Sequence, residues 1–303
     1  MNNPVISLCI PTYNRAKCLR QCLDSIVEQF KDPIVQESVE VVISNNASTD
    51  DTEKVAKEFQ NQFSNIFYYK NNENIRVDRN ILNVVEKAKG KYVWFLGDDD
   101  ALFPGSINYM LQELELQKFK YCIVNCLGYD NNLLNPAVSH PNFALESNQY
   151  FNVLKDYVVK MDKKDMAGNF CGLSMQVFDR ELWQSCLNKQ EYVDSNAVHL
   201  FILLSVMKDQ GFALIAKPLV KVRAANIRWE TFPGLETLKK RADSTSSILA
   251  WILETYKIPH SKMALKIEQN KNLLNSWGTG VLRKYIFRSQ GLRDFVKKIL
   301  GKL

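Results

Sequence analysis

Residues 93–100 read VWFLGDDD: four large apolar side chains, a glycine, and three consecutive carboxylates, Asp98, Asp99 and Asp100. The apolar run is typical of a buried strand. Three adjacent anions repel one another, and a bound cation relieves that repulsion. Ligands bind at the carboxyl ends of strands in open α/β sheets, and carboxylate oxygens suit Mg²⁺ or Mn²⁺ carrying a diphosphate. The stretch therefore predicts a metal–diphosphate site; the alternative is a solvated acidic turn, because Asp and Gly are common turn residues.

Strand and helix patterns alternate before this stretch. Strand patterns cover residues 5–10, 39–44 and 66–69. Helical spacing of apolar residues follows each strand, at about 19–30, 55–63 and 78–89, and Gly90 is expected to close the third helix. Short connections between alternating elements indicate parallel strands with helices on both faces. The predicted fold class is α/β, a Rossmann-like, mostly parallel sheet flanked by helices.

The pattern is less regular after Gly105. Strands are expected at 121–127, 169–178 and 213–216, and an apolar helix at 198–207. We expect one domain over residues 1–230 and an appended helical region over residues 231–303.

Composition limits the class of protein. At 303 residues and 46% hydrophobic content the chain can form a large core. The seven cysteines form no CxxC pair, which favours reduced thiols over disulfides or zinc. No apolar run reaches the length of about 18 residues that spans a bilayer, and the first residues resemble a strand rather than a signal peptide. We therefore expect a cytoplasmic protein.

The basic charge of the chain is concentrated at its end. Residues 281–303 hold seven basic side chains against one acidic residue, Asp294, which accounts for the whole net charge of +6. The apolar side chains from Leu292 to Leu303 form one helical stripe. This basic amphipathic helix predicts association with an anionic membrane surface, and packing onto the domain or a partner is the alternative. Nucleic acid is not an expected partner, because no recognition module accompanies the charge. No pattern indicates an oligomeric state.

Four motifs occur in an order and spacing that resembles the family 2 glycosyltransferases, within them the abequosyltransferase-like enzymes of bacterial surface polysaccharide synthesis. They are PTYNR (11–15), SNNASTD (44–50), NENIRVDRN (72–80) and AKGKYVWFLGDDDALFPG (88–105). The resemblance implies a GT-A fold, a nucleotide-diphosphate sugar donor and inverting transfer to an acceptor, which a lipid-linked glycan would fit.

The resemblance also implies how the donor is bound. Pro11, Thr12 and Tyr13 would pack on the nucleotide base. Asn45 and Asn46 stand where the family has an Asp that accepts the uracil N–H, and their alternative role is a turn or a helix cap.

The motif around Arg79 and the acidic stretch would bind the diphosphate. Arg79 would contact it, with a surface salt bridge as the alternative. Asn74 stands where the family has a glycine, which suggests a positive φ. Gly97 replaces the first carboxylate of the family's Asp-x-Asp-Asp motif. In that register Asp99 is the best metal ligand, Asp98 meets the ribose or a metal-bound water, and Asp100 supports either.

The catalytic base is not obvious, because the family's Glu-Asp pair is replaced by His199 and Leu200. His199 has a suitable pKa for a base, but a core histidine is its ordinary explanation. Asp194, whose alternative role is a helix cap, ranks just below it, and Glu191 ranks third.

Two arginines follow in the basic segment 221–229. Arg223 and Arg228 would lie in a loop over the donor phosphates, and a solvated strand and turn is the alternative.

Two other functions are compatible with parts of the pattern. A non-catalytic sugar-nucleotide-binding or scaffold protein of a glycan assembly complex would explain Gly97 and the missing acidic pair. A nucleotidyltransferase would also use metal-binding carboxylates, but it needs a glycine-rich phosphate loop after the first strand, and PTYNRAKC contains no glycine.

Overall fold

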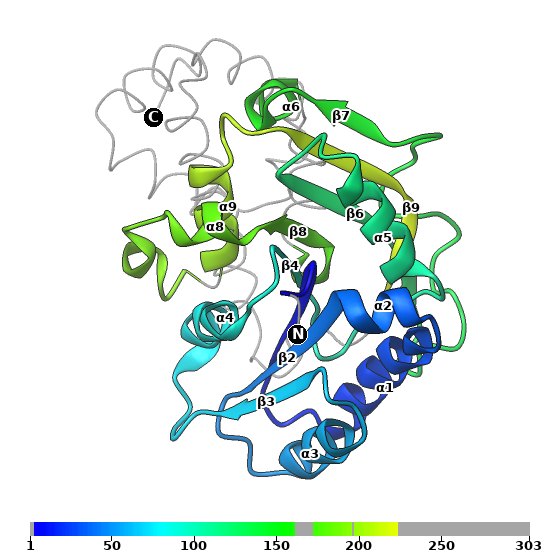
Figure 1. Ribbon diagram of the computed structural model, residues 1–303, viewed down its shortest axis with the longest axis vertical. Coiled ribbons are helices and arrows are strands. Elements are labelled where there is room, and N and C mark those ends of the chain that lie inside the picture. The colour runs from blue at the N-terminus through cyan, green and yellow to red at the C-terminus, as the bar shows by residue number, and fades with distance from the viewer. Residues whose placement is uncertain (1–2, 161–171, 196, 224–303) are drawn as a thin grey trace, which may run out of the picture. The chain divides into compact units, whose positions relative to one another are not determined.

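The computed structural model describes residues 3–160, 172–195 and 197–223. Their strands form one sheet in the order β3-β2-β1-β4-β8-β6-β9-β5, with β7 paired to β9 (Figure 1). The region 231–303, with its basic amphipathic helix, lies outside the described residues, as does Arg228.

The first half of the sheet is parallel, as predicted. It consists of β1 (Ile6–Thr12), β2 (Val39–Asn45), β3 (Ile66–Lys70) and β4 (Tyr92–Phe95). Central β1 pairs with β2 on one side and β4 on the other, and Thr12 at its carboxyl end lies opposite Asn45. Because the four strands run the same way, the loops that follow β1, β2 and β4 meet at one edge of the sheet.

Helices cover both faces of this sheet. The helices of the first half are α1 (Ala16–Val27), α2 (Pro33–Ser38), α3 (Thr52–Gln62), α4 (Arg76–Lys87) and α5 (Ser106–Glu115), with a 3₁₀ turn, η1, at Glu28–Lys31. Helix α1 buries Leu19, Cys22, Leu23 and Ile26, which share one face at helical spacing. Figure 1 shows α1, α2 and α5 on one side of the sheet and α4, α8 and α9 on the other.

Gly90 does not close α4, contrary to expectation, because this helix ends at Lys87 with Ala88 as its C-cap. The glycine is needed for a different reason. A Cβ at position 90 would lie 2.6 Å from the backbone nitrogen of Ser7. The buried Glu40 carboxylate completes the contact by accepting hydrogen bonds from Ser7 Oγ at 2.6 Å and from the Gly90 N–H at 3.2 Å.

The second half of the sheet is mixed. Its strands are β5 (Ala101–Leu102), β6 (Tyr121–Tyr129), β7 (Gln149–Phe151), β8 (Gln176–Asp179) and β9 (Phe212–Arg223). Strand β8 is antiparallel to both β4 and β6, and β5 and β7 are antiparallel to β9, whereas β6 and β9 are parallel. The α/β class is confirmed, but parallel pairing dominates only in the first half. The sequence did not predict the antiparallel strands, because apolar runs indicate strands without fixing their direction.

Two elements differ in length from the predicted ones. The described part of the expected strand 169–178 is a 3₁₀ turn, η3 (Leu173–Met175), followed by short β8. Strand β9 continues to Arg223 instead of ending near Ala216.

The remaining helices each pack through aromatic side chains. They are α6 (Leu154–Lys160), α8 (Arg180–Gln184), the 3₁₀ turn η4 (Lys189–Tyr192) and α9 (Val198–Val206). Phe95, Phe178 and Trp183 all contact one another, with ring centroids 5.1 Å (Phe95–Phe178), 5.0 Å (Phe178–Trp183) and 5.7 Å (Phe95–Trp183) apart. Helix α9 is buried from Val198 through Leu204, which explains why it is apolar on all sides.

Two further observations concern thiols and membrane spans. The six cysteines within the described ranges are all free, and Cys18 alone among them is not buried. In the same ranges no helix has both the length and the apolar character needed to cross a bilayer.

Candidate active site

The three carboxylates after β4 each contact a different part of the fold. Asp98 accepts a hydrogen bond of 2.7 Å from Thr12 Oγ1, and both residues are buried. Thr12 ends β1, the neighbour of β4, so the parallel pairing itself brings the two together. The residues Asp98, Asp99 and Asp100 are called the acidic loop below.

Asp99 carries the most exposed side chain of the acidic loop, at 26%. Its Oδ2 lies 3.1 Å from Nη1 of Arg15, whose side chain is only 12% exposed. Burial acts to lower the pKa of Arg15, but the carboxylates of Asp98 and Asp99 raise it, and the net shift is upward. The sequence analysis did not include Arg15 among the predicted site residues. Its place directly after PTYN, at the carboxyl end of β1, is the signal that would have indicated it.

Asp100 is buried and held by two donors. Ser174 Oγ donates to its Oδ2 at 2.5 Å, and the backbone N–H of Arg223 donates to its Oδ1 at 3.2 Å. Burial and the negative charge of Asp99 raise the pKa of Asp100 to about 7. Ser174 is a second residue that the sequence did not indicate, because it comes from η3, 74 positions further along the chain.

The structure explains the glycine at position 97. The Gly97 N–H donates to Ser174 Oγ at 2.8 Å. A Cβ there would lie 3.0 Å from Oδ1 of Asp99 and 3.2 Å from Ser174 Oγ. A fourth carboxylate would therefore crowd the acidic loop, and the serine hydroxyl occupies this space instead.

A metal ion fits this site if the substrate supplies part of its coordination. Among the described residues, no three His, Cys, Asp or Glu side chains converge into a metal-binding group. Asp98 and Asp100 are buried against Thr12 and Ser174, whereas Asp99 is partly exposed. One exposed carboxylate with diphosphate oxygens is an oxygen donor set that Mg²⁺ or Mn²⁺ accepts.

Arg223 lies at the site but not in a loop. It ends β9, and its side chain runs into the protein, where Nε donates to the backbone carbonyl of Asp99 at 2.9 Å and Nη2 to Gln21 Oε1 at 2.9 Å. The residue is 7% exposed. Arg223 therefore fixes the backbone of the acidic loop, which corrects the expectation of a loop arginine over the phosphates.

The loops at the predicted binding site for the nucleotide base are joined by side-chain amides. Asn45 donates to Tyr68 OH at 2.8 Å and accepts from the Ser48 N–H at 2.9 Å. Asn46 donates to Asn74 Oδ1 at 2.8 Å, and its own Oδ1 accepts from the Ile75 N–H and from Asn71. Both residues are buried, so the turn-forming role proposed for them is the one with visible contacts.

Asn74 is not among the residues with positive φ in the described part of the chain. The residue that adopts this conformation is Arg76, at φ 68°. Asn74 contributes its side chain instead, because its Oδ1 also accepts from the Arg76 N–H at 2.9 Å. At the end of β1, Pro11 and Tyr13 are half-buried, which leaves part of each ring accessible beside buried Thr12.

Two candidate site residues meet at the start of α4. Oδ1 of Asp194 lies 3.3 Å from Nη1 of Arg76 and 3.4 Å from Nη1 of Arg79. The side chain of Asp194 is 49% exposed and that of Arg76 is 74% exposed. Asp194, with a φ of 70°, lies in the turn after η4 and does not cap α9, whose N-cap is Ala197. Glu191 lies exposed on η4 nearby in the chain.

His199 is a core residue by its surroundings. It is 5% exposed on α9, and its ring meets that of Phe95 nearly edge-on, with centroids 6.3 Å apart. Asp194 is thus the more accessible of the two leading candidates for the base.

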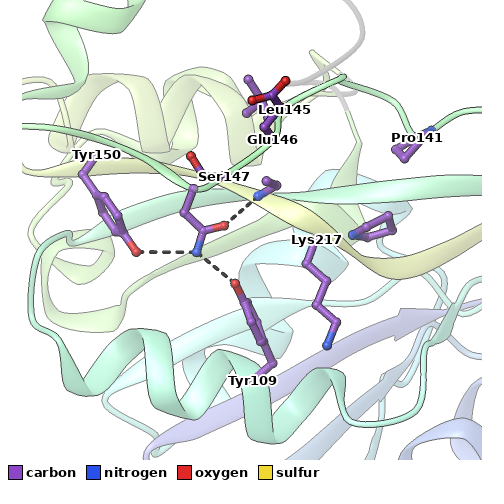
Figure 2. Close-up of a pocket in the computed structure, with 10 residues that line it drawn as sticks. Tyr109, Pro141, Leu145, Glu146, Ser147, Tyr150 and Lys217 are labelled. Carbon is purple, nitrogen blue, oxygen red and sulfur yellow. Dashed lines mark hydrogen bonds between the residues drawn. The ribbon is translucent and has the colours of Figure 1, made fainter.

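A pocket of about 650 Å³ lies away from all these residues, between α5, β7 and β9. Figure 2 shows Tyr109, Tyr150 and Lys217 around it. Asn148 joins its walls by donating to Tyr109 OH at 3.0 Å and accepting from the Ala216 N–H at 2.9 Å. No residue of the predicted site lines this pocket, so its volume does not mark the site.

Comparison with known proteins agrees with the motifs. The family model described as "Glycosyl transferase family 2" matches residues 7–182. Abequosyltransferase RfbV of Salmonella typhimurium is 34% identical over 231 residues, covering 75% of this chain and 68% of the relative. A Campylobacter jejuni protein named GalNAc(5)-diNAcBac-PP-undecaprenol beta-1,3-glucosyltransferase is 26% identical, covering 69% of this chain and 62% of the relative.

Solved structures share the fold. Staphylococcus aureus TarS in complex with UDP-GlcNAc matches with a TM-score of 0.59 and 14% identity, over 91% of this chain and 82% of that one. The mannosyltransferase PcManGT from Pyrobaculum calidifontis, in complex with GDP-Man and Mn²⁺, matches with a TM-score of 0.51 and 15% identity, over 98% of this chain and 84% of that one.

Proposed function

This chain belongs to glycosyl transferase family 2, and on that premise we propose that it is a metal-dependent, inverting enzyme that moves one sugar from a nucleotide-diphosphate sugar to a lipid-linked glycan. The observation that carries the proposal is the acidic loop. It lies at the carboxyl edge of the parallel half-sheet and leaves the Asp99 side chain partly exposed beside Arg15 and Arg223.

The chain's own side chains divide the work of binding the donor. Pro11, Thr12 and Tyr13 pack on the base, and buried Asn45 and Asn46 shape the loops around it. Arg79 meets the diphosphate. Asp99, supported by Asp98 and Asp100, would hold Mg²⁺ or Mn²⁺, which when bound neutralises charge on the leaving diphosphate.

For the chemical step we favour Asp194 as the base that takes the acceptor hydroxyl proton while that oxygen attacks the anomeric carbon. Its exposed carboxylate can reach a substrate, whereas His199 packs in the core and exposed Glu191 forms no ion pair within the described part of the chain. The ion pair with Arg79 puts Asp194 beside a proposed diphosphate ligand.

The acceptor and the location follow from other observations. The Campylobacter relative carries a lipid, PP-undecaprenol, in its name. The basic amphipathic stripe at residues 292–303 suits an anionic membrane surface. We therefore place the reaction at the cytoplasmic face of the membrane, where the tail and Arg228, both outside the described residues, would meet lipid and donor.

Calorimetry against UDP, GDP, CDP and dTDP, each with Mn²⁺ and with EDTA, tests the proposal. We expect one nucleotide to bind only with Mn²⁺. Asp130→Asn is the control and should bind like the wild type, because the Asp130 carboxylate accepts hydrogen bonds from Asn132, Leu134 and Asn135 of its own loop. If the folded protein binds no nucleotide under either condition, the proposed enzymatic function is wrong and a scaffold role replaces it.

A further inference from the structure

Arg15 places a guanidinium on the exposed carboxylate of the acidic loop. Its backbone is fixed, because its N–H donates to Thr52 Oγ1 at 3.0 Å and its carbonyl accepts from the Leu19 N–H at 2.8 Å in the first turn of α1. Its side chain has several rotatable bonds and reaches Asp99 Oδ2 with a single nitrogen, Nη1. The backbone of Arg15 can therefore stay in place while its guanidinium changes partner.

A divalent cation on Asp99 would compete with this ion pair. Two cations on one carboxylate lie within a few ångströms of each other, so they repel each other strongly at the dielectric of a protein surface. A guanidinium that leaves Asp99 has a strong alternative partner, because its planar fork matches phosphate oxygens.

We infer that Arg15 is the counter-ion of Asp99 in the metal-free protein, and that binding of metal and diphosphate transfers its guanidinium from Asp99 to a donor phosphate oxygen. The inference rests on the proposed nucleotide-sugar binding. Arg15 then disfavours the metal alone and favours the metal together with the diphosphate, so it couples the two binding steps.

The other arginine at Asp99 makes the contrast clear. Arg223 contacts the backbone carbonyl of Asp99 and is tied to Gln21, so it holds the loop without occupying the carboxylate. Of these two arginines, Arg15 is the one that would compete with a metal for the carboxylate.

The test compares Arg15→Gln with Arg20→Gln. Arg20 lies on α1 and pairs with Glu58 at the surface, away from the acidic loop, so both variants lose one positive charge from neighbouring positions. Binding of Mn²⁺ alone is measured by the paramagnetic resonance of free Mn²⁺, and binding of the nucleoside diphosphate chosen by the wild type is measured by calorimetry with Mn²⁺.

We expect Arg15→Gln to bind Mn²⁺ alone about tenfold more tightly and the diphosphate with Mn²⁺ about tenfold more weakly, the scale of one charge-assisted hydrogen bond. Arg20→Gln should match the wild type in both. The two affinities should change in opposite directions, and this distinguishes the inference from general damage to the site, which would weaken the binding of both Mn²⁺ and diphosphate.

Equal binding of Mn²⁺ by wild type and Arg15→Gln, whether weak or strong, overturns the inference, as does a change shared by Arg20→Gln. If the wild type binds no diphosphate with Mn²⁺, the proposed function fails instead. If Arg15→Gln does not fold, Arg15→Lys is tested in its place. Lysine keeps the positive charge but lacks the planar fork of the guanidinium, so diphosphate binding should weaken. Unchanged diphosphate binding would refute the transfer.

Discussion

Two groups of acidic and arginine side chains differ in how the fold holds them. In the acidic loop, Thr12 of β1 contacts Asp98 and Ser174 of η3 contacts Asp100, whereas Arg223 of β9 contacts both Asp99 and Asp100; most of these atoms are buried. At the start of α4, Asp194 meets Arg76 and Arg79 through long, exposed ion pairs. Burial with several partners fixes a geometry, whereas exposed pairs contribute little to stability and can rearrange for a substrate.

The largest expected effect comes from removing the exposed carboxylate of the buried group. Asp99→Asn should lower Mn²⁺-dependent nucleotide affinity and sugar transfer by about a thousandfold, because the metal loses its charged ligand. The fold should persist, since Asp99 lies partly in solvent. Calorimetry and far-ultraviolet circular dichroism check both points, and unchanged affinity in Mn²⁺ would remove the metal from the mechanism.

The next effect separates the two base candidates. Asp194→Asn should lower kcat by about a hundredfold while leaving donor affinity nearly unchanged, the scale expected for a general base. His199→Asn should instead lower the free energy of unfolding, by about 2 kcal/mol, because it alters a buried packed side chain. Steady-state kinetics at saturating donor and urea unfolding distinguish them; a loss of kcat confined to His199→Asn would reverse the assignment.

A third prediction concerns pH and the buried Asp100. Its pKa is about 7 in the folded protein and about 4 in the unfolded chain, so the folded state binds the extra proton between these values. Its contribution to stability is therefore fully present below pH 4 and is lost as the pH rises towards 7, by roughly 1 kcal/mol per pH unit. In EDTA, the free energy of unfolding measured with urea should fall with this slope as the pH rises for the wild type, and with a smaller slope for Asp100→Asn. Equal slopes for the two proteins would contradict the assignment of this pH dependence to Asp100.

The smallest effects compare single contacts of the two groups directly. Thr12→Val removes the hydroxyl that donates to buried Asp98 and should cost about 1–3 kcal/mol of stability. Arg76→Gln removes one exposed ion pair and should cost less than about 0.5 kcal/mol. Thermal unfolding measures both, and equal losses would mean that burial does not distinguish the groups.

The predictable part of the site is local in sequence. The VWFLGDDD stretch placed three carboxylates after a buried strand, and PTYNR placed Thr12 at the end of another, so their meeting followed from parallel pairing. The contacts from Ser174, Gly97 and the buried side chain of Arg223 were not predictable, because each depends on how distant segments approach one another.

Apolar periodicity and the order of the motifs are readable from the amino-acid sequence, and they were enough to predict the family and the parallel half-sheet, because they depend on residues close together in the chain. The tertiary structure alone decided the antiparallel insertion of β8, the extension of β9 to Arg223 and the pairing of Arg15 with Asp99. Strand direction and long-range ion pairs depend on which segments share a surface, and hydrophobic periodicity carries no information on that.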